Sequence, residues 1–216
     1  MAGAPSDDGG KPVLITPPVA SSKFRFAIFF GWGIFAAGVA AFVEALALGF
    51  HAAITVDLLI VLFAPLIEEF GRTASLVALS DQSGPPRADQ YRWPVLAFGL
   101  GFTFFEAISH WLLMRQGSNS LVVFVATLSP LAMHLSNTIV TAVFVMAGRQ
   151  LTGFAICATI HAVHNAWVEF VWRDLPPIAE LISSSVQIAI FVAIGLWFWI
   201  GWSRLGPEYQ FRAQLR

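Results

Sequence analysis

The chain has 216 residues, of which 57% are hydrophobic and 12% are charged, and its mean hydropathy is +0.72. A water-soluble domain of this size would lack the polar residues needed to cover its surface, so the composition predicts an integral membrane protein. The formal net charge of −1 offers no basic face for nucleic acid, and the single cysteine, Cys157, excludes an intrachain disulfide.

The predicted elements begin after a polar amino-terminal tail. Residues 1–23 combine Pro, Gly, Ser and Asp, which predicts a flexible tail and not a signal peptide. Apolar segments long enough to cross the hydrocarbon core as helices come next, at residues 26–50, 54–79, 93–114, 121–147, 152–172 and 178–202. We therefore predict an all-α polytopic bundle of about six transmembrane helices. It forms one domain over residues 24–204, and residues 205–216 form a second tail.

Basic residues are distributed unequally over the predicted connections. With an even number of spans, both tails and two loops share one side of the membrane, which holds nine Lys and Arg residues: Lys11, Lys23, Arg25, Arg87, Arg92, Arg149, Arg204, Arg212 and Arg216. The opposite side holds only Arg115 and Arg173, while Arg72 lies inside a span. Because cytoplasmic segments carry the excess of positive charge, both termini are predicted to be cytoplasmic.

Function is indicated by ionisable and polar residues inside the spans. They lie in the second to fifth segments: Glu68, Glu69, Arg72, Glu106, His110, His134, Asn137, His161, His164 and Asn165. A charged residue at the centre of a membrane helix costs about 2.5–3.5 kcal/mol, so these side chains must face one another or water. We therefore expect residues 54–172 to form a four-helix core around one site.

Helical spacing permits such a site. Glu68 and Arg72 are four residues apart, as are His161 and Asn165, so each pair shares one face of its helix. Pro65 precedes Glu69 by four residues, and a proline there frees a backbone carbonyl one turn earlier and kinks the helix.

A purely structural role explains some of these polar residues better than others. A single membrane histidine such as His51, His110 or His164 is typically a hydrogen-bonding residue between helices, and Glu44 lies near enough to a span end to reach the interface. The second segment is different, because an ion pair needs one acid and this segment supplies two.

The order of these residues resembles the PrsW family of intramembrane proteases, within the superfamily that includes type II CAAX prenyl proteases and bacteriocin-processing membrane proteins. The resemblance is carried by EExxR at residues 68–72, FxxxE at 102–106 and HxxxN at 161–165. PrsW-type sequences usually have EExxK and HxxxD, whereas CAAX-type relatives have EExxxR, FxxxH and HxxxN. The chain thus combines features of both, and Glu106 in the second motif favours the PrsW side.

The resemblance implies an intramembrane endopeptidase of the bacterial cytoplasmic membrane that cleaves a membrane-associated protein or a lipidated peptide. It implies that Glu68 is the general base that activates water, with Glu69 assisting and Arg72 as electrostatic partner. His161 and Asn165 would donate hydrogen bonds to the developing oxyanion. Glu106 would position a histidine or the water, and His134 would make a further catalytic contribution. His110 and His164 would give structural support.

Two other chemistries use the same helices. Glu69, Glu106, His134 and His161 offer oxygen and nitrogen ligands of the kind that zinc accepts, so zinc is the candidate cofactor of a metal-assisted scheme. Cys157 lies four residues before His161 and shares its helix face, which makes a thiol nucleophile geometrically possible. A catalytic role for Cys157 is disfavoured, because its surroundings are apolar and the family motif does not include this position.

Two alternatives belong to other functional classes. A proton-coupled transporter would also place Glu and His along a membrane path, but six helices without an internal repeat give little material for alternating access. A non-catalytic scaffold subunit would keep the histidines and dispense with the acids, so the intact EExxR group favours an enzyme.

Overall fold

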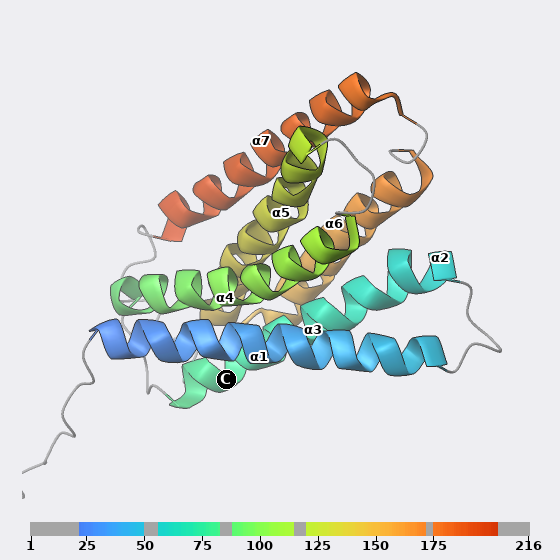
Figure 1. Cartoon of the computed structure of the whole chain (residues 1–216). Helices are drawn as coiled ribbons and strands as arrows, with labels where there is room; N and C mark the ends of the chain where they lie inside the picture. Colours follow the sequence, from blue (N-terminus) through green and yellow to red (C-terminus); the bar gives the residue numbers. More distant parts are fainter. Residues whose placement is uncertain (1–21, 50–55, 83–87, 115–119, 172–174, 203–216) are drawn as a thin grey trace, which may run out of the picture.

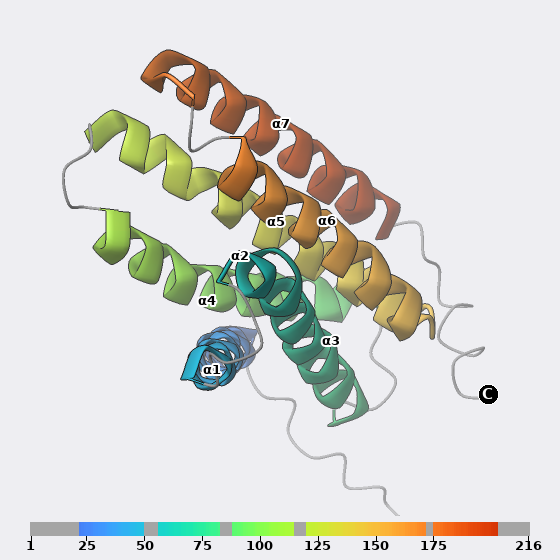
Figure 2. The same ribbon diagram turned by 90° about the vertical axis from the view of Figure 1, so that its right-hand side faces the viewer.

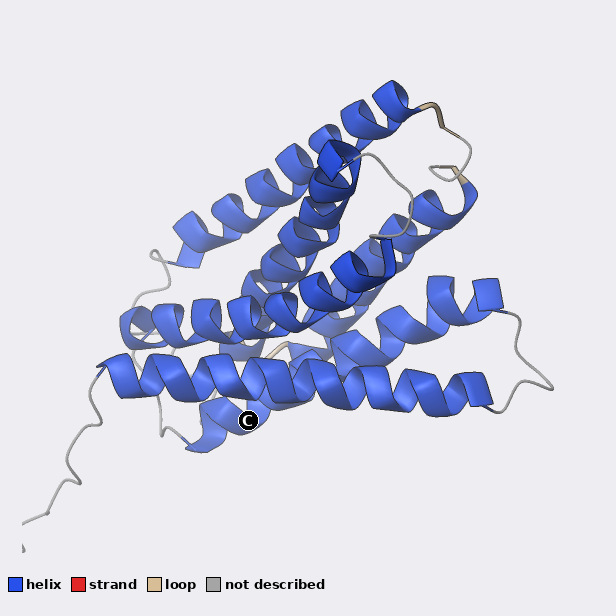
Figure 3. Ribbon diagram, in the orientation of Figure 1, coloured by secondary structure: helices blue, strands red, loops and turns tan. Residues whose placement is uncertain are grey.

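The computed structural model describes residues 22–49, 56–82, 88–114, 120–171 and 175–202, and these are helical apart from short connections, with no strand among them (Figure 3). The helices are α1 (Ser22–Gly49), α2 (Val56–Leu58), η1 (Leu59–Phe63), α3 (Ala64–Gln82), α4 (Ala88–Met114), α5 (Ser120–Met146), α6 (Gln150–Phe170) and α7 (Pro177–Trp202). The predicted all-α class is confirmed. Most of the two predicted tails, residues 1–21 and 205–216, and also His51 lie outside the described residues.

Helix α3, which carries Glu68, Glu69 and Arg72, packs against three other helices. It contacts α1, α5 and α6, while α1 runs along α4 and α5 contacts both α4 and α7 (Figures 1 and 2). Two glycines let α1 and α4 approach closely: a Cβ added at Gly33 would overlap the Phe98 carbonyl, and one added at Gly101 would overlap the Phe30 carbonyl. Small residues of this kind are what permit close backbone contact between membrane helices.

Three helices are long and apolar enough to cross a membrane, over Arg25–Ala47, Phe124–Met146 and Pro177–Trp202. Large apolar side chains on the outside of the bundle include Phe42, Leu151 and Trp197, which are 62%, 78% and 77% exposed. An exposed apolar surface of this extent is typical of a face that contacts lipid. Among the described residues, α3, α4 and α6 do not meet this length and composition test, so the structure supports an integral membrane protein without establishing six spans.

The second predicted segment is helical over residues 56–82. Within it, Leu59–Phe63 form a π turn between two α-helical parts. In that turn the Ala64 N–H donates to the Leu59 carbonyl, five residues back. The π turn ends two residues before Pro65, which is consistent with the helix distortion expected from this proline. Pro130, by contrast, lies inside the helix α5 without dividing it.

Candidate active site

Polar side chains from α3 to α6 meet in the interior of the bundle. Those of α3 and α4 are Glu68, Glu69, Arg72 and Glu106, and those of α5 and α6 are His134, Asn137 and His161. All except Glu106 are at most 9% exposed. The structure thus brings together the five residues expected to form one site, Glu68, Glu69, Glu106, His134 and His161.

Glu69 anchors this cluster. Its Oε1 atom forms an ion pair with Arg72 and accepts a hydrogen bond of 2.9 Å from Asn137 Nδ2. The Nδ1 atom of His161 lies 3.1 Å from the same oxygen. One carboxylate oxygen therefore receives donors from α3, α5 and α6, which orients all three partners. This geometry suits a carboxylate that holds other groups in place.

His134 is held from both sides of its ring. Its Nδ1 atom lies 2.7 Å from Arg72 Nη2, and because a guanidinium can only donate, this nitrogen accepts. The ring proton then belongs to Nε2, which lies 2.6 Å from Glu106 Oε2. Glu106 thus lies against a histidine, the contact that one of its two expected roles requires. The His134 ring stands edge-on to His161, with 4.7 Å between ring centroids.

Glu68 differs from its neighbour. Its Oε2 atom is buried without a hydrogen-bond partner and lies 3.9 Å from both His134 Nδ1 and His161 Nε2. These distances are too long for direct hydrogen bonds and short enough to be spanned by one water molecule. Since His161 Nδ1 donates to the Glu69 carboxylate, its Nε2 atom presents a lone pair to the same space.

The donor set also suits a metal ion. One ligand atom from each of Glu68, His134 and His161 lies within 4.8 Å of the other two. The contact of His161 with Glu69 is the carboxylate–histidine arrangement that commonly orients metal ligands. His134 would have to release Arg72 or Glu106 to join such a site, because both of its nitrogens are already engaged. This set of possible ligands contains two that the sequence predicted, His134 and His161, together with Glu68. The other two predicted ligands, Glu69 and Glu106, contact these histidines instead.

Asn165, His164 and Cys157 make contacts outside this space. Asn165 Nδ2 donates to the Ile60 carbonyl at 2.9 Å. His164 is buried, and its ring packs against Phe191 of α7. The Cys157 thiol contacts the Thr141 hydroxyl and the Asn137 carbonyl, at 3.3 and 3.5 Å. The side chain of His110 lies outside the described part of the structure.

One residue of the cluster was not expected from the sequence. From its sequence position Glu44, on α1, lies near enough to a span end to reach the interface, but its Oε1 atom is buried and its carboxyl group is close enough to Glu68 to interact with it electrostatically. Glu106 also interacts electrostatically with Glu68. The only sequence signal was that Glu44 is an acid inside an apolar span, which by default indicates a functional site.

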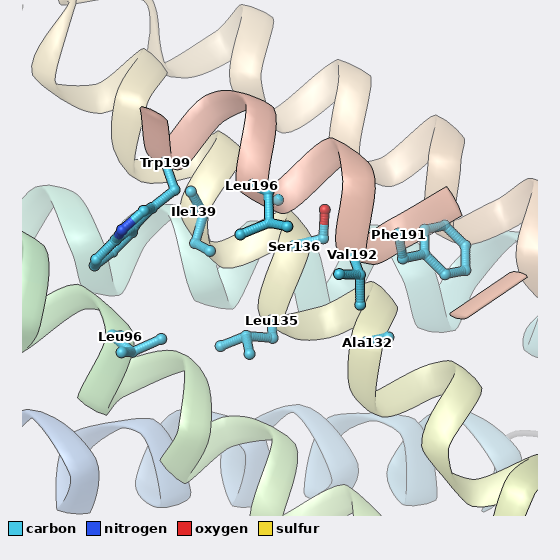
Figure 4. Close-up of a pocket in the computed structure, with 10 residues that line it drawn as sticks. Leu96, Ala132, Leu135, Ser136, Ile139, Phe191, Val192, Leu196 and Trp199 are labelled. Carbon is cyan, nitrogen blue, oxygen red and sulfur yellow. The ribbon is translucent and has the colours of Figure 1, made fainter. Parts of the chain in front are cut away.

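A cavity of about 230 Å³ lies elsewhere, between α4, α5 and α7 (Figure 4). Its walls are apolar apart from Ser136, and no carboxyl or imidazole group lines it, so it is separate from the Glu/His cluster.

No family model, curated protein or solved structure matches the chain.

Proposed function

We propose that the protein is an intramembrane endopeptidase, similar to the PrsW type, that hydrolyses a membrane-associated protein or peptide. The observation that supports this most is the unpartnered, buried Glu68 Oε2 atom facing nitrogen atoms of two histidines at 3.9 Å. Six membrane spans with both termini in the cytoplasm belong to the same proposal, on the strength of the nine-to-two distribution of basic residues.

In this proposal one water molecule bridges Glu68 and His161. Both side chains present acceptors there, so the two hydrogens of the water would be held and an oxygen lone pair would point away toward a substrate carbonyl. The water oxygen attacks the carbonyl carbon while Glu68 takes its proton. Glu68 then gives that proton to the leaving nitrogen as the C–N bond breaks, which yields a carboxylic acid and an amine.

The charges of the cluster allow a metal-assisted version. Four carboxyl groups, of Glu44, Glu68, Glu69 and Glu106, are gathered near one guanidinium, that of Arg72. So much uncompensated negative charge is unfavourable inside a bilayer, and a divalent cation or bound protons would reduce it. Glu68, His134 and His161 would hold zinc, which when bound would acidify a water ligand.

The proposal is tested by replacing Glu68 with Gln, which keeps the volume and removes the proton-accepting carboxylate. Cells that contain each variant at matched level are compared by mass spectrometry of newly formed amino termini in the membrane fraction. We expect cleavage products that depend on the wild-type chain to fall at least about 100-fold with Glu68→Gln. Glu180→Gln, the same chemical change on α7, is the control and should retain them.

Wild-type cleavage by both Glu68→Gln and His161→Ala would refute the peptidase proposal and favour a structural or transport role for the cluster. The metal question has its own measurement, zinc titration of the purified protein by calorimetry after treatment with a chelator. Binding of one zinc ion that is lost in His161→Ala supports the metal-assisted scheme. Undiminished cleavage in the zinc-free protein supports the scheme with Glu68 alone.

A further inference from the structure

The π turn before α3 leaves one backbone carbonyl without a backbone donor. Within the turn, Ala64 N–H donates to Leu59 O, five residues back. The next bond of this pattern would run from residue 65 to Ile60 O, but residue 65 is proline and has no N–H. Ile60 is 37% exposed on the outside of the bundle, where lipid supplies no donor if this segment spans the membrane, so the turn needs a donor from elsewhere.

Asn165 supplies that donor from another helix. Its Nδ2 atom donates to Ile60 O at 2.9 Å. Asn165 is one turn after His161 on α6, and His161 contacts Glu69 and Glu68 on the far side of the π turn. Helix α6 therefore contacts residues 56–82 at two points, one within the π turn and one after it.

We propose that Asn165 is a positioning residue, which holds the π turn through the Ile60 carbonyl and thereby sets the rotation of α3 that aims Glu68 at the two histidines. A π turn contains one extra residue, so it rotates the rest of the helix by about 100° relative to an uninterrupted α-helix. Glu68 lies five residues after the turn, and an altered register would turn its carboxyl group away from His134 and His161. The catalytic consequence rests on the proposed function, whereas the backbone contact does not.

The inference is tested by supplying the missing donor in a different way. Pro65→Ala introduces an N–H that can donate to Ile60 O and makes the Asn165 amide dispensable. The variants Asn165→Ala, Pro65→Ala and the double variant are compared by hydrogen–deuterium exchange in lipid nanodiscs, and by mass spectrometry of newly formed amino termini in cells. Thr159→Ala is the matched control, because its exposed hydroxyl donates only to Ala155 O within α6.

We expect Asn165→Ala to accelerate exchange in residues 59–64 about tenfold, as the loss of one hydrogen bond would, with α5 unchanged. Cleavage should fall about tenfold or more. Pro65→Ala alone should resemble the wild type, and the double variant should recover both exchange protection and cleavage to within about threefold. Thr159→Ala should alter neither.

Four results would overturn the proposal. Unchanged exchange in Asn165→Ala would show that the amide does not hold the turn, and equal acceleration throughout the protein would show a global effect. Recovered protection without recovered cleavage in the double variant would place the Asn165 amide directly at the reacting atoms. If Pro65→Ala loses cleavage while residues 59–64 stay protected from exchange, then the proline and not Asn165 sets the helical register of α3. If the wild type itself cleaves nothing, the proposed function fails, and the exchange data still decide whether Asn165 holds the turn.

Discussion

Replacing Glu69 with Gln is expected to destabilise the protein far more than the same replacement at Glu68. The Glu69 Oε1 atom pairs with Arg72 and is within bonding distance of Asn137 and His161, and the Arg72 side chain is completely buried. A neutral amide at position 69 leaves that guanidinium without its closest counter-charge. Breaking a buried pair by removing one partner costs about 3–5 kcal/mol. We expect the lower end, about 3 kcal/mol, because the Gln oxygen still accepts one hydrogen bond.

At Glu68 the same change removes a buried carboxylate whose Oε2 atom has no hydrogen-bond partner. The free energy of unfolding should therefore change by less than about 1 kcal/mol, because little favourable interaction is lost and a desolvation cost is relieved. A side chain that adds little stability and that the proposed mechanism requires for cleavage is what a trade-off between stability and activity predicts.

The measurement is reversible unfolding by SDS in mixed micelles, monitored through the fluorescence of the eight tryptophans. The midpoint should shift strongly for Glu69→Gln and hardly at all for Glu68→Gln. Equal losses of stability in the two variants would refute the division of the adjacent acids into an anchor and a reactive group. A larger loss at Glu68 would reverse it.

Two further predictions concern orientation and the thiol. Reporter fusions after Ala88 and at the carboxyl terminus should both read cytoplasmic, and a fusion near Asn119 should read external, because nine basic residues lie on one predicted side and two on the other; an external carboxyl terminus would contradict six spans. Cys157→Ala should retain cleavage within about threefold, because the buried thiol contacts Thr141 and a backbone carbonyl and none of the cluster acids. Abolished cleavage would restore a thiol mechanism.

Much of the cluster could be predicted from hydropathy, spacing and the order of the motifs. Residues four apart share a helix face and acids inside an apolar span must find partners, and the resemblance to membrane proteases then selected Glu68, Glu69, Arg72, His134 and His161. The division of labour between the two acids could not be predicted. Adjacent residues on a helix point about 100° apart, so packing of α4, α5 and α6 around α3 decides which acid meets Arg72 and Asn137.

The contacts of Asn165 and Glu44 depend on long-range packing in the same way. Pro65 predicted a freed carbonyl, but the sequence did not show that a π turn would move it from Val61 to Ile60 or that α6 would supply the donor. Glu44 meets Glu68 only because α1 packs on α3. A single acid without a periodic polar neighbour carries no sequence information about the partner it will have.

The distribution of hydropathy suggests how such a cluster can enter a membrane. The helices that meet the spanning test include α5, which contributes His134 and Asn137, and α1, which contributes the single acid Glu44. The other acids and the arginine of the cluster lie on α3 and α4, which do not meet it. Glu69 and Arg72 are three residues apart on one helix, so they can neutralise each other within α3 before other helices pack. Glu68 shares this guanidinium with Glu69, and its other neighbours come from α1, α4, α5 and α6. The acid that we propose as the general base is therefore the one whose burial depends on four other helices, so its surroundings form only as these helices pack around α3.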